Sequence, residues 1–309
     1  KACFVILVRN KEIHSLRYSI QQLEDRFNHR YHYPYVILND EPITPIFKRY
    51  LSRIVSGNIT FGVVPEEHWS YPPWINQQKA AIARVKMRNI IYGGSESYRH
   101  MCRFNSGFFY RHPLMADYDY YWRVEPGVQF TCEVDYDPFV YMQERKLKYG
   151  FAISMKEIPP TVTTLWATTQ QFMREHRHLI PSDNTLAWVA EPKRSTYNMC
   201  HFWSNFEIAS LAFYRSPEYQ AYFDYLDRAG GFFYERWGDA PVHSLAAAMF
   251  LQKDEIHWFH DIGYIHGGIA NCPIDPKLNY DKCFCSPVVS SYYSSFSCTK
   301  EFEKLDPTK

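Results

Sequence analysis

The chain has 309 residues, and its 46% apolar content is enough to bury a large hydrophobic core. Its 34 basic residues nearly balance its 33 acidic ones, so it lacks the basic excess of a protein that binds nucleic acid or an anionic membrane surface. No linker-like segment, internal repeat or low-complexity stretch divides it. We therefore expect a single domain over residues 1–309 and no nucleic-acid partner.

The first part of the chain alternates between strand-like and helix-like patterns. A buried strand is predicted over residues 2–8 and a helix over residues 11–27, where apolar residues recur at helical spacing. A second strand is predicted over residues 35–38, a helix over residues 46–54 and a third strand over residues 59–64. Strands that alternate with helices in this way favour a parallel sheet with right-handed crossovers, which is an α/β fold.

Polar residues follow the first two predicted strands. Arg9 and Asn10 come after the first strand, and Asn39 and Asp40 come after the second. Ligands of parallel sheets bind beyond the carboxyl ends of the strands, so these residues are expected at the mouth of a nucleotide-sized crevice. The chain contains no GxGxxG or GxxxxGKS/T sequence, and phosphate groups bound there must be neutralised by something other than a glycine-rich loop.

The middle and later segments combine helices with one aromatic-rich strand. Helices are predicted over residues 77–92, 95–111 and 240–250. The strand covers residues 117–125 and ends in an acid and a Pro-Gly turn, which is a common place for a metal ligand. Asp239 directly precedes the last of these helices and is predicted as its N-cap.

The cysteines and a glycosylation sequence point to an oxidising compartment. None of the eight cysteines form a Cys-x-x-Cys pair of the kind found in zinc or redox sites, so disulfides are the better interpretation, with a disulfide-tied tail expected beyond residue 272. Asn58-Ile-Thr60 is a sequon that has meaning only in the secretory pathway. No segment approaches the roughly 20 apolar residues of a membrane span, and we expect a luminal domain without its N-terminal anchor and stem. The cysteines are Cys3, Cys102, Cys132, Cys200, Cys272, Cys283, Cys285 and Cys298.

Four long blocks of the sequence carry a family resemblance. They are Tyr92-Gly-Gly-Ser-Glu-Ser-Tyr-Arg-His-Met-Cys102, Tyr121-Trp-Arg-Val-Glu-Pro126, Cys200-His-Phe-Trp-Ser-Asn-Phe-Glu207 and Gly230-Gly-Phe-Phe-Tyr-Glu-Arg-Trp-Gly-Asp-Ala-Pro-Val-His-Ser244. These blocks resemble those of the fungal Ktr/Mnt α-1,2-mannosyltransferases of glycosyltransferase family 15, and the similarity covers nearly the whole chain. The resemblance implies a single-domain GT-A fold, in which a Rossmann-like, mixed but mostly parallel sheet is flanked by helices.

The resemblance also implies a chemistry. Enzymes of this kind transfer mannose from GDP-mannose with retention of configuration and use Mn²⁺ as cofactor. The expected acceptors are mannosylated N-linked or O-linked glycans of glycoproteins. The expected place is the Golgi lumen, where a type II membrane protein touches the membrane only through an N-terminal anchor, which lies outside this sequence.

The metal ligands are expected in two separate segments. In the family, an acid-Pro-acid sequence holds Mn²⁺ against the diphosphate through its leading glutamate, which here is Glu125; Gly127 stands where the second acid is usual. The resemblance gives His266 as the second protein ligand. Carboxylate oxygen and imidazole suit Mn²⁺, and the diphosphate and water can complete its coordination. Without the resemblance, the simpler interpretation of Glu125 is a surface acid, and that of His266 is a histidine satisfied in the core.

Four residues are candidates for catalysis or donor binding. Glu207 is the candidate carboxylate for the oxocarbenium-like centre, acting by covalent capture or by charge; the alternative is a structural acid that accepts backbone hydrogen bonds. By family position, Tyr98 contacts the donor phosphate or serves as an alternative nucleophile, unless it is only a packed ring. Asp239 resembles the acid that binds sugar hydroxyls, a role that can coexist with helix capping. Arg9 is a candidate for a guanosine or phosphate contact, with a surface salt bridge as its alternative.

Two mechanisms and two other functions stay open from the sequence. Either Glu207 attacks to give a mannosyl-enzyme, or the acceptor hydroxyl enters on the leaving-group face while a phosphate oxygen takes its proton. In both, Mn²⁺ neutralises the charge that grows on the β-phosphate. The rival functions are a mannoside hydrolase, with Glu125 and Glu207 as its acid and nucleophile, and a noncatalytic glycan-binding homologue, which Gly127 favours slightly.

Overall fold

A central seven-stranded sheet organises the chain in the computed structural model, which describes residues 1–191 and 195–305. Strands β1, β2, β3 and β4 are mutually parallel neighbours, and β12 is parallel to β6. Only β11 runs antiparallel to both of its neighbours, β4 and β6, so the prediction of a mixed but mostly parallel sheet is confirmed. In sheet order the strands are β12 (Ile256–Trp258), β6 (Tyr149–Phe151), β11 (Glu207–Ser210), β4 (Tyr120–Arg123), β1 (Ala2–Leu7), β2 (Tyr35–Asn39) and β3 (Ile59–Val63).

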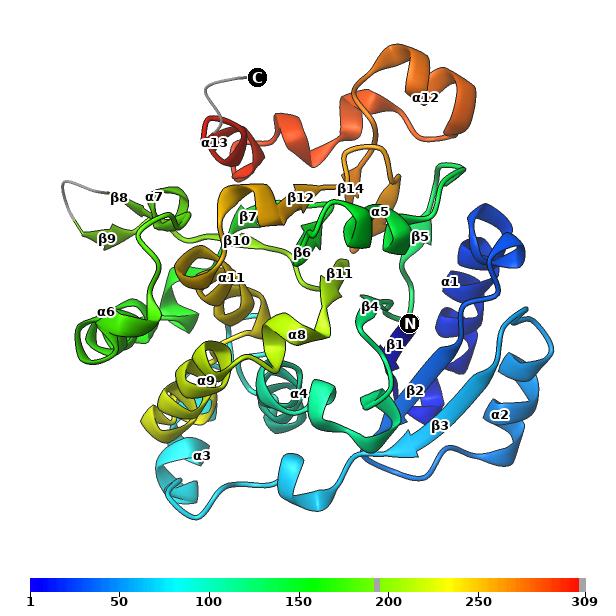
Figure 1. Cartoon of the computed structure of the whole chain (residues 1–309). Helices are drawn as coiled ribbons and strands as arrows, with labels where there is room; N and C mark the ends of the chain where they lie inside the picture. The colour runs from blue at the N-terminus through cyan, green and yellow to red at the C-terminus, as the bar shows by residue number, and fades with distance from the viewer. Residues whose placement is uncertain (192–194, 306–309) are drawn as a thin grey trace.

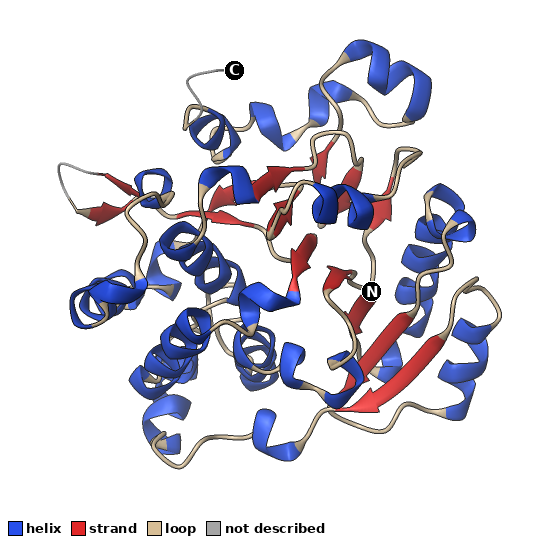
Figure 2. Ribbon diagram, viewed as in Figure 1, coloured by secondary structure: helices blue, strands red, loops and turns tan. Residues whose placement is uncertain are grey.

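Helices cover both faces of this sheet and enclose two separate cores (Figure 1, Figure 2). One core lies under α1, whose Leu16, Ile20 and Leu23 recur at helical spacing and are fully buried. The other contains α11, and ten of its twelve residues are buried, which explains why its sequence is apolar on all sides. The first layer consists of α1 (Ile13–Arg26), α2 (Pro45–Ser52) and α5 (Pro138–Glu144), and the second includes α4 (Glu96–Gly107), α6 (Leu165–Glu175), α9 (Pro217–Ala229) and α11 (Asp239–Phe250).

Smaller elements complete the fold. A three-stranded sheet has the order β14-β13-β5, and two further strand pairs are β10 with β7 and β8 with β9. None of the helices in the described ranges is both long and apolar enough to cross a membrane. Other elements before the C-terminal tail are α3 (Gln77–Lys86), α7 (Leu186–Val189), α8 (Leu211–Tyr214), α10 (Gly231–Tyr234), β5 (Gln129–Phe130), β7 (Ser154–Lys156), β8 (Ala190–Glu191), β9 (Thr196–Tyr197), β10 (Cys200–Phe202), β13 (Tyr264–His266) and β14 (Ile269–Asn271).

The structure corrects several predicted bounds. The helix predicted over residues 95–111 is α4, which ends at Gly107, and the strand predicted over residues 117–125 is β4, which covers only Tyr120–Arg123. The helix predicted over residues 77–92 ends at Lys86, and the chain then turns towards Gly93, with Tyr92 at a positive φ of 57° that a helix cannot contain. The prediction of Asp239 as N-cap is wrong, because the N-cap of α11 is Gly238 and Asp239 is the first helical residue. Its carboxylate pairs with Arg123 and accepts a hydrogen bond from Ser204.

Three disulfides tie the C-terminal tail, as predicted. Two of them, Cys132–Cys283 and Cys200–Cys298, join the tail to the body of the chain, and Cys272–Cys285 closes a loop inside the tail. Cys3 and Cys102 are free and buried, so the prediction that the cysteines are disulfide-bonded is wrong for this pair. The tail also contains α12 (Pro276–Lys282) and α13 (Thr299–Glu303), which its aperiodic sequence did not indicate.

Candidate active site

Glu125 and His266 converge at the carboxyl end of β4. Glu125 lies two residues beyond the end of this strand, and His266 is the last residue of β13. The chain after Glu125 forms β5, which pairs with β13 and carries His266 back over the end of β4. Nε2 of His266 lies 3.9 Å from Oε2 of Glu125, and each side chain is 26% exposed.

This spacing fits one shared divalent cation. Two ligand atoms that each lie about 2.1 Å from an ion can be up to about 4.2 Å apart, so both atoms can reach the same ion. The ring of Trp203 packs edge-on against His266 with centroids 5.1 Å apart, which limits rotation of the imidazole. The metal roles of Glu125 and His266 stay predictions, but the geometry permits them.

Arg123 links Glu125 to Asp239. Its Nη2 lies 2.5 Å from Oε1 of Glu125, and its Nη1 lies 2.5 Å from Oδ2 of Asp239. Burial alone would lower the pKa of Arg123, but the charges of Asp239 and Glu125 outweigh it and raise that pKa above its ordinary value. The guanidinium is therefore a fixed positive charge between two carboxylates, and it leaves Oε2 of Glu125 free to face His266.

Asp239 is held as an anion at the start of α11. The Ser204 hydroxyl donates to the same Oδ2 that pairs with Arg123, at 2.7 Å. Burial alone would raise the pKa of Asp239, but the charge of Arg123 and, less strongly, that of His243 hold the pKa below its ordinary value. The free N–H groups of the first helical turn add a favourable field for this anion.

Tyr98 lies in the first turn of α4 and is packed from two sides. The exposed ring of Tyr92 stacks on it with centroids 4.5 Å apart, and the guanidinium of Arg236 lies 5.4 Å from its ring centre. Burial raises the pKa of Tyr98 well above its ordinary value. The phenol therefore stays protonated near neutral pH, which suits a hydrogen-bond donor to phosphate better than a phenolate nucleophile.

Glu207 lies deeper, on β11, and its side chain has no exposed surface. Its Oε1 accepts hydrogen bonds from the hydroxyls of Tyr121 and Tyr214, and its Oε2 accepts one from Tyr149 at 2.6 Å. Nδ1 of His243 lies 2.9 Å from the same Oε2. These four donors close around the carboxylate, so direct attack on a sugar stays a prediction that requires the cage to open. Its alternative, a structural acid, fits with tyrosine hydroxyls in place of backbone amides.

Arg9 follows β1, and Gly127 follows Glu125 by two residues. Arg9 forms the surface salt bridge that was its alternative role, with Nη2 2.9 Å from Oε1 of Glu12 and its side chain 54% exposed. A nucleotide contact by Arg9 stays a prediction. Gly127 has a φ of 85°, and apart from its chain neighbours no described residue lies within 4 Å of the position that a Cβ would take. The second motif acid is thus replaced by a residue suited to the turn, with open space around it.

Sequence reasoning missed Arg123, Ser204 and His243. Arg123 precedes Glu125 by two residues, and period-two alternation along a strand is the signal that places the two on the same side. His243 follows Asp239 by four residues on one helix, which is the corresponding helical signal. Ser204 offered no such signal, because it comes from a loop that only the tertiary fold brings to Asp239.

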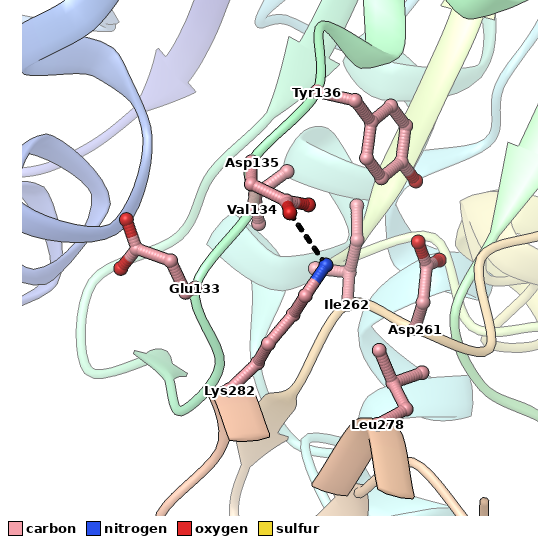
Figure 3. Close-up of a pocket in the computed structure, with 8 residues that line it drawn as sticks. All are labelled: Glu133, Val134, Asp135, Tyr136, Asp261, Ile262, Leu278 and Lys282. Atoms are coloured by element: carbon pink, nitrogen blue, oxygen red, sulfur yellow. Dashed lines mark hydrogen bonds and ion pairs between the residues drawn. The ribbon is translucent and has the colours of Figure 1, made fainter.

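A second polar cleft lies outside this site, between the segment 133–136 and the tail (Figure 3). Nζ of Lys282 lies 2.6 Å from Oδ2 of Asp135, and the Tyr136 hydroxyl points toward Asp261. None of the predicted site residues lines the cleft. Together with the Cys132–Cys283 disulfide, its ion pair fastens the tail.

Comparisons with known sequences identify the family of the chain. Residues 1–307 match the family described as "Glycolipid 2-alpha-mannosyltransferase". The chain is 56% identical to "Alpha-1,2 mannosyltransferase KTR1" of Saccharomyces cerevisiae, over 99% of this chain and 79% of that protein. It is 52% identical to "Glycolipid 2-alpha-mannosyltransferase 1" of Candida albicans, over 100% of this chain and 72% of that protein. The family resemblance of the four sequence blocks is confirmed.

Solved structures give the same result for the fold. The mannosyltransferase Ktr4p from S. cerevisiae in complex with GDP superposes with a TM-score of 0.93 at 40% identity, over 98% of this chain and 81% of that one. The Mn/GDP form of core-mannan synthase A from Aspergillus fumigatus gives a TM-score of 0.91 at 42% identity, over 98% of this chain and 84% of that one. The predicted single-domain GT-A fold is confirmed by these matches.

Proposed function

Because the chain belongs to the glycolipid 2-alpha-mannosyltransferase family, we propose that it transfers mannose from GDP-mannose, with retention, to the 2-hydroxyl of a mannose-containing acceptor. The observation that carries this proposal is the approach of Glu125 to His266 beside the ion pair of Arg123 and Asp239. A carboxylate and an imidazole aimed at one point, next to a fixed cation and a second anion, suit a nucleotide-sugar diphosphate better than a neutral glycan alone.

Glu125 and His266 are the residues that hold the divalent cation, for which we propose Mn²⁺ because a relative was solved in a Mn/GDP form. When bound, the ion supplies positive charge for the diphosphate as it leaves. Arg123 orients one oxygen of Glu125 and leaves the other toward His266. Trp203 restricts the imidazole, so the two ligand atoms are already close before the ion arrives.

Asp239 and Tyr98 are the residues placed to contact sugar and phosphate. Arg123 and Ser204 both bind Oδ2 of Asp239, which leaves Oδ1 to accept a hydrogen bond from a sugar hydroxyl. Tyr98 keeps its proton, since burial raises its pKa, and can donate it to a donor phosphate oxygen. Asp239 therefore accepts a hydrogen bond from a sugar hydroxyl, and Tyr98 donates a hydrogen bond to a phosphate oxygen of GDP-mannose.

Retention does not require an enzyme nucleophile. If the acceptor hydroxyl enters on the face from which GDP departs, the bond to C1 forms and breaks on one side, and a phosphate oxygen takes the hydroxyl proton. The closed cage around Glu207 favours this branch over covalent capture. A mannosyl adduct on a peptide that contains Glu207, found after a rapid quench with donor alone, would overturn this choice.

The test of the function is incubation with GDP-mannose, Mn²⁺ and methyl-α-mannoside, followed by linkage analysis of the product. We expect an α-1,2-linked dimannoside that disappears when EDTA removes the metal. Cleavage of aryl mannosides without metal would instead support the mannoside hydrolase. Calorimetric binding of mannoside, with no binding of GDP in the presence of Mn²⁺, would support the noncatalytic glycan-binding homologue.

We further propose that the enzyme acts in the Golgi lumen on N-linked or O-linked mannosylated glycans of glycoproteins. Three disulfides support an oxidising compartment. Asn58 of the sequon is exposed and precedes β3, the edge strand of the large sheet, where a glycan has room. Secreted protein should therefore lose mass on endoglycosidase treatment, and the Asn58→Gln variant should not. An unchanged mass for both, together with a cytosolic position of the tagged full protein, would contradict this location.

A further inference from the structure

The imidazole of His243 has hydrogen-bond acceptors at both of its nitrogens. Nε2 lies 3.0 Å from the backbone carbonyl oxygen of Asn105, and Nδ1 lies 2.9 Å from Oε2 of Glu207. A carbonyl oxygen carries no proton, so Nε2 must donate. The side chains of His243 and Glu207 are 1% and 0% exposed, so water does not supply alternative partners.

Three tyrosine hydroxyls decide where the second proton lies. Tyr121, Tyr149 and Tyr214 all bond the carboxylate of Glu207. Burial raises the pKa values of Tyr149 and Tyr214 well above their ordinary value, so these phenols stay protonated and donate. A carboxyl group that receives three O–H donors is stabilised as an anion.

The proton between Glu207 and His243 therefore belongs to the imidazole. Tyr214 also lies 3.2 Å from Nδ1, but its single proton is used 2.6 Å away on Glu207. Burial alone lowers the pKa of His243, yet the charge of Glu207 and its hydrogen bond outweigh burial and raise the pKa. An ion pair with every polar atom satisfied is the arrangement in which two buried charges are tolerated.

This ion pair connects the elements that carry the candidate site residues. His243 is four residues after Asp239 on α11, and Glu207 stands opposite Arg123 in the register of β11 with β4. Asn105 belongs to α4, whose first turn contains Tyr98. One imidazole thus contacts α4 through Nε2 and β11 through Nδ1, and it is itself part of α11.

We propose that His243 is a protonated imidazolium at neutral pH that pairs with the Glu207 carboxylate and positions Asp239, Arg123 and Tyr98 from beneath the site. The proposal rests on the proposed mannosyl transfer for its kinetic consequences. Glu207 and His243 are positioning residues, and neither touches the sugar. The charges of His243 and Glu207 cancel each other. The net charge of the site is therefore set by Glu125, Arg123 and Asp239.

The protonation state can be tested in the unaltered protein. Histidine labelled with ¹⁵N gives long-range ¹H–¹⁵N spectra that distinguish an imidazolium from either neutral tautomer, and the signals that vanish in His243→Gln assign the ring. We expect two protonated nitrogens on His243 at pH 7.5, where a solvent-exposed histidine is mostly neutral. A neutral ring at that pH overturns the proposal whatever the enzyme's activity. An imidazolium in a protein that transfers no mannose would instead contradict only the proposed function.

The positioning role can be tested by removing the two charges separately and together. Glu207→Gln and His243→Gln should each lower kcat by about 100-fold, with a smaller change in KM for GDP-mannose, since displaced groups lose transition-state contacts. The double variant leaves no unpaired charge and should recover at least tenfold of that loss, which a merely additive effect would not do. Near-UV circular dichroism establishes that each variant is folded.

A nucleophilic role for Glu207 makes the opposite predictions. Azide would then restore turnover to Glu207→Ala by attacking C1 in place of the missing carboxylate, with a C–N bond formed and GDP released. We expect no mannosyl azide. Azide rescue, or a double variant as inactive as Glu207→Gln alone, would assign Glu207 to the reaction itself and overturn the positioning role.

Discussion

The chain contains two glutamate–histidine pairs. They differ in solvent exposure and in how many of their polar atoms already have hydrogen-bond partners. Glu125 and His266 face each other across 3.9 Å, and each is 26% exposed. Glu207 and His243 are in hydrogen-bond contact at 2.9 Å and are almost completely buried. The same two residue types therefore form an open pair at the end of β4 and a closed pair beneath it.

The difference shows why residue type alone does not assign a role. The open pair keeps an imidazole nitrogen and a carboxylate oxygen turned toward one point, so an ion can complete both. In the closed pair, tyrosine hydroxyls and the imidazole already occupy the carboxylate oxygens, and no ligand can be added without breaking a hydrogen bond. The open pair is suited to bind a cation, and the closed pair is suited to hold neighbouring site residues in position.

The largest effect should come from breaking the open pair. Glu125→Ala removes a cation ligand and should lower kcat/KM by about 100-fold or more, since even residues behind metal ligands cost up to that factor. The apparent affinity for Mn²⁺ should fall in parallel, measured from initial rates during a manganese titration. EDTA should abolish the activity of the unaltered enzyme.

A matched control is Glu144→Ala, which removes an exposed carboxylate at the end of α5. Its rate and manganese dependence should stay as in the unaltered protein. If Glu125→Ala behaved like this control, the open pair would not be the cation site, and the contrast between the two pairs would lose its functional meaning.

The closed pair should reveal itself in stability. Tyr149→Phe deletes one donor to a buried anion and should lower the free energy of unfolding by about 2 kcal/mol, because hydrogen bonds to charged groups are worth more than neutral ones. The control is Tyr222→Phe, whose buried hydroxyl hydrogen-bonds to the neutral hydroxyl of Thr169 at 2.7 Å, with an expected cost of about 1 kcal/mol. Urea unfolding measures both values. Equal losses would indicate that Glu207 is not an anion.

The closed pair also predicts how stability changes with pH. The pKa of His243 is raised in the folded state, so its stabilisation is complete below the ordinary histidine value near 6.5 and is lost as pH rises through the folded value. The pKa of Asp239 is lowered, so its contribution is complete above 3.8 and is lost as pH falls below it. The charged and titratable groups around His243 are Glu207, Tyr214, Tyr219, Asp239 and Arg123.

We therefore expect the difference in unfolding free energy between the unaltered protein and His243→Gln to be largest near pH 5–6 and to shrink above pH 6.5. Taking the difference cancels the opposite trends of His68, His100 and His201, whose pKa values burial lowers. Urea unfolding from pH 5 to pH 9 gives the profile. A difference that grows with pH would mean that His243 is neutral when folded.

The sequence predicted the open pair but not the closed one. The alternating strands and helices of the first 64 residues predicted a parallel sheet with a binding crevice at the carboxyl ends of its strands. The family resemblance pointed to Glu125 and His266. The closed pair depends on β11, a four-residue strand buried at every position, which carries no alternation to reveal it. Three tyrosines from different elements surround Glu207, and a single sequence gives no signal for such long-range contacts.

The smallest effect should come from restoring the usual acid at the rim of the open pair. Gly127→Asp adds a side chain whose Cβ would meet no described residue within 4 Å apart from its chain neighbours, and aspartate tolerates a φ of 85° better than most residues. An added exposed charge is worth up to about 1 kcal/mol, so apparent Mn²⁺ affinity should rise by no more than about fivefold, with kcat unchanged. Gly127→Asn has nearly the same shape without the charge and should leave the affinity unaltered. If both variants raised the apparent Mn²⁺ affinity equally, restriction of the backbone would be the cause. If Gly127→Asp lowered kcat more than tenfold, the donor would need the space that glycine leaves beside the open pair.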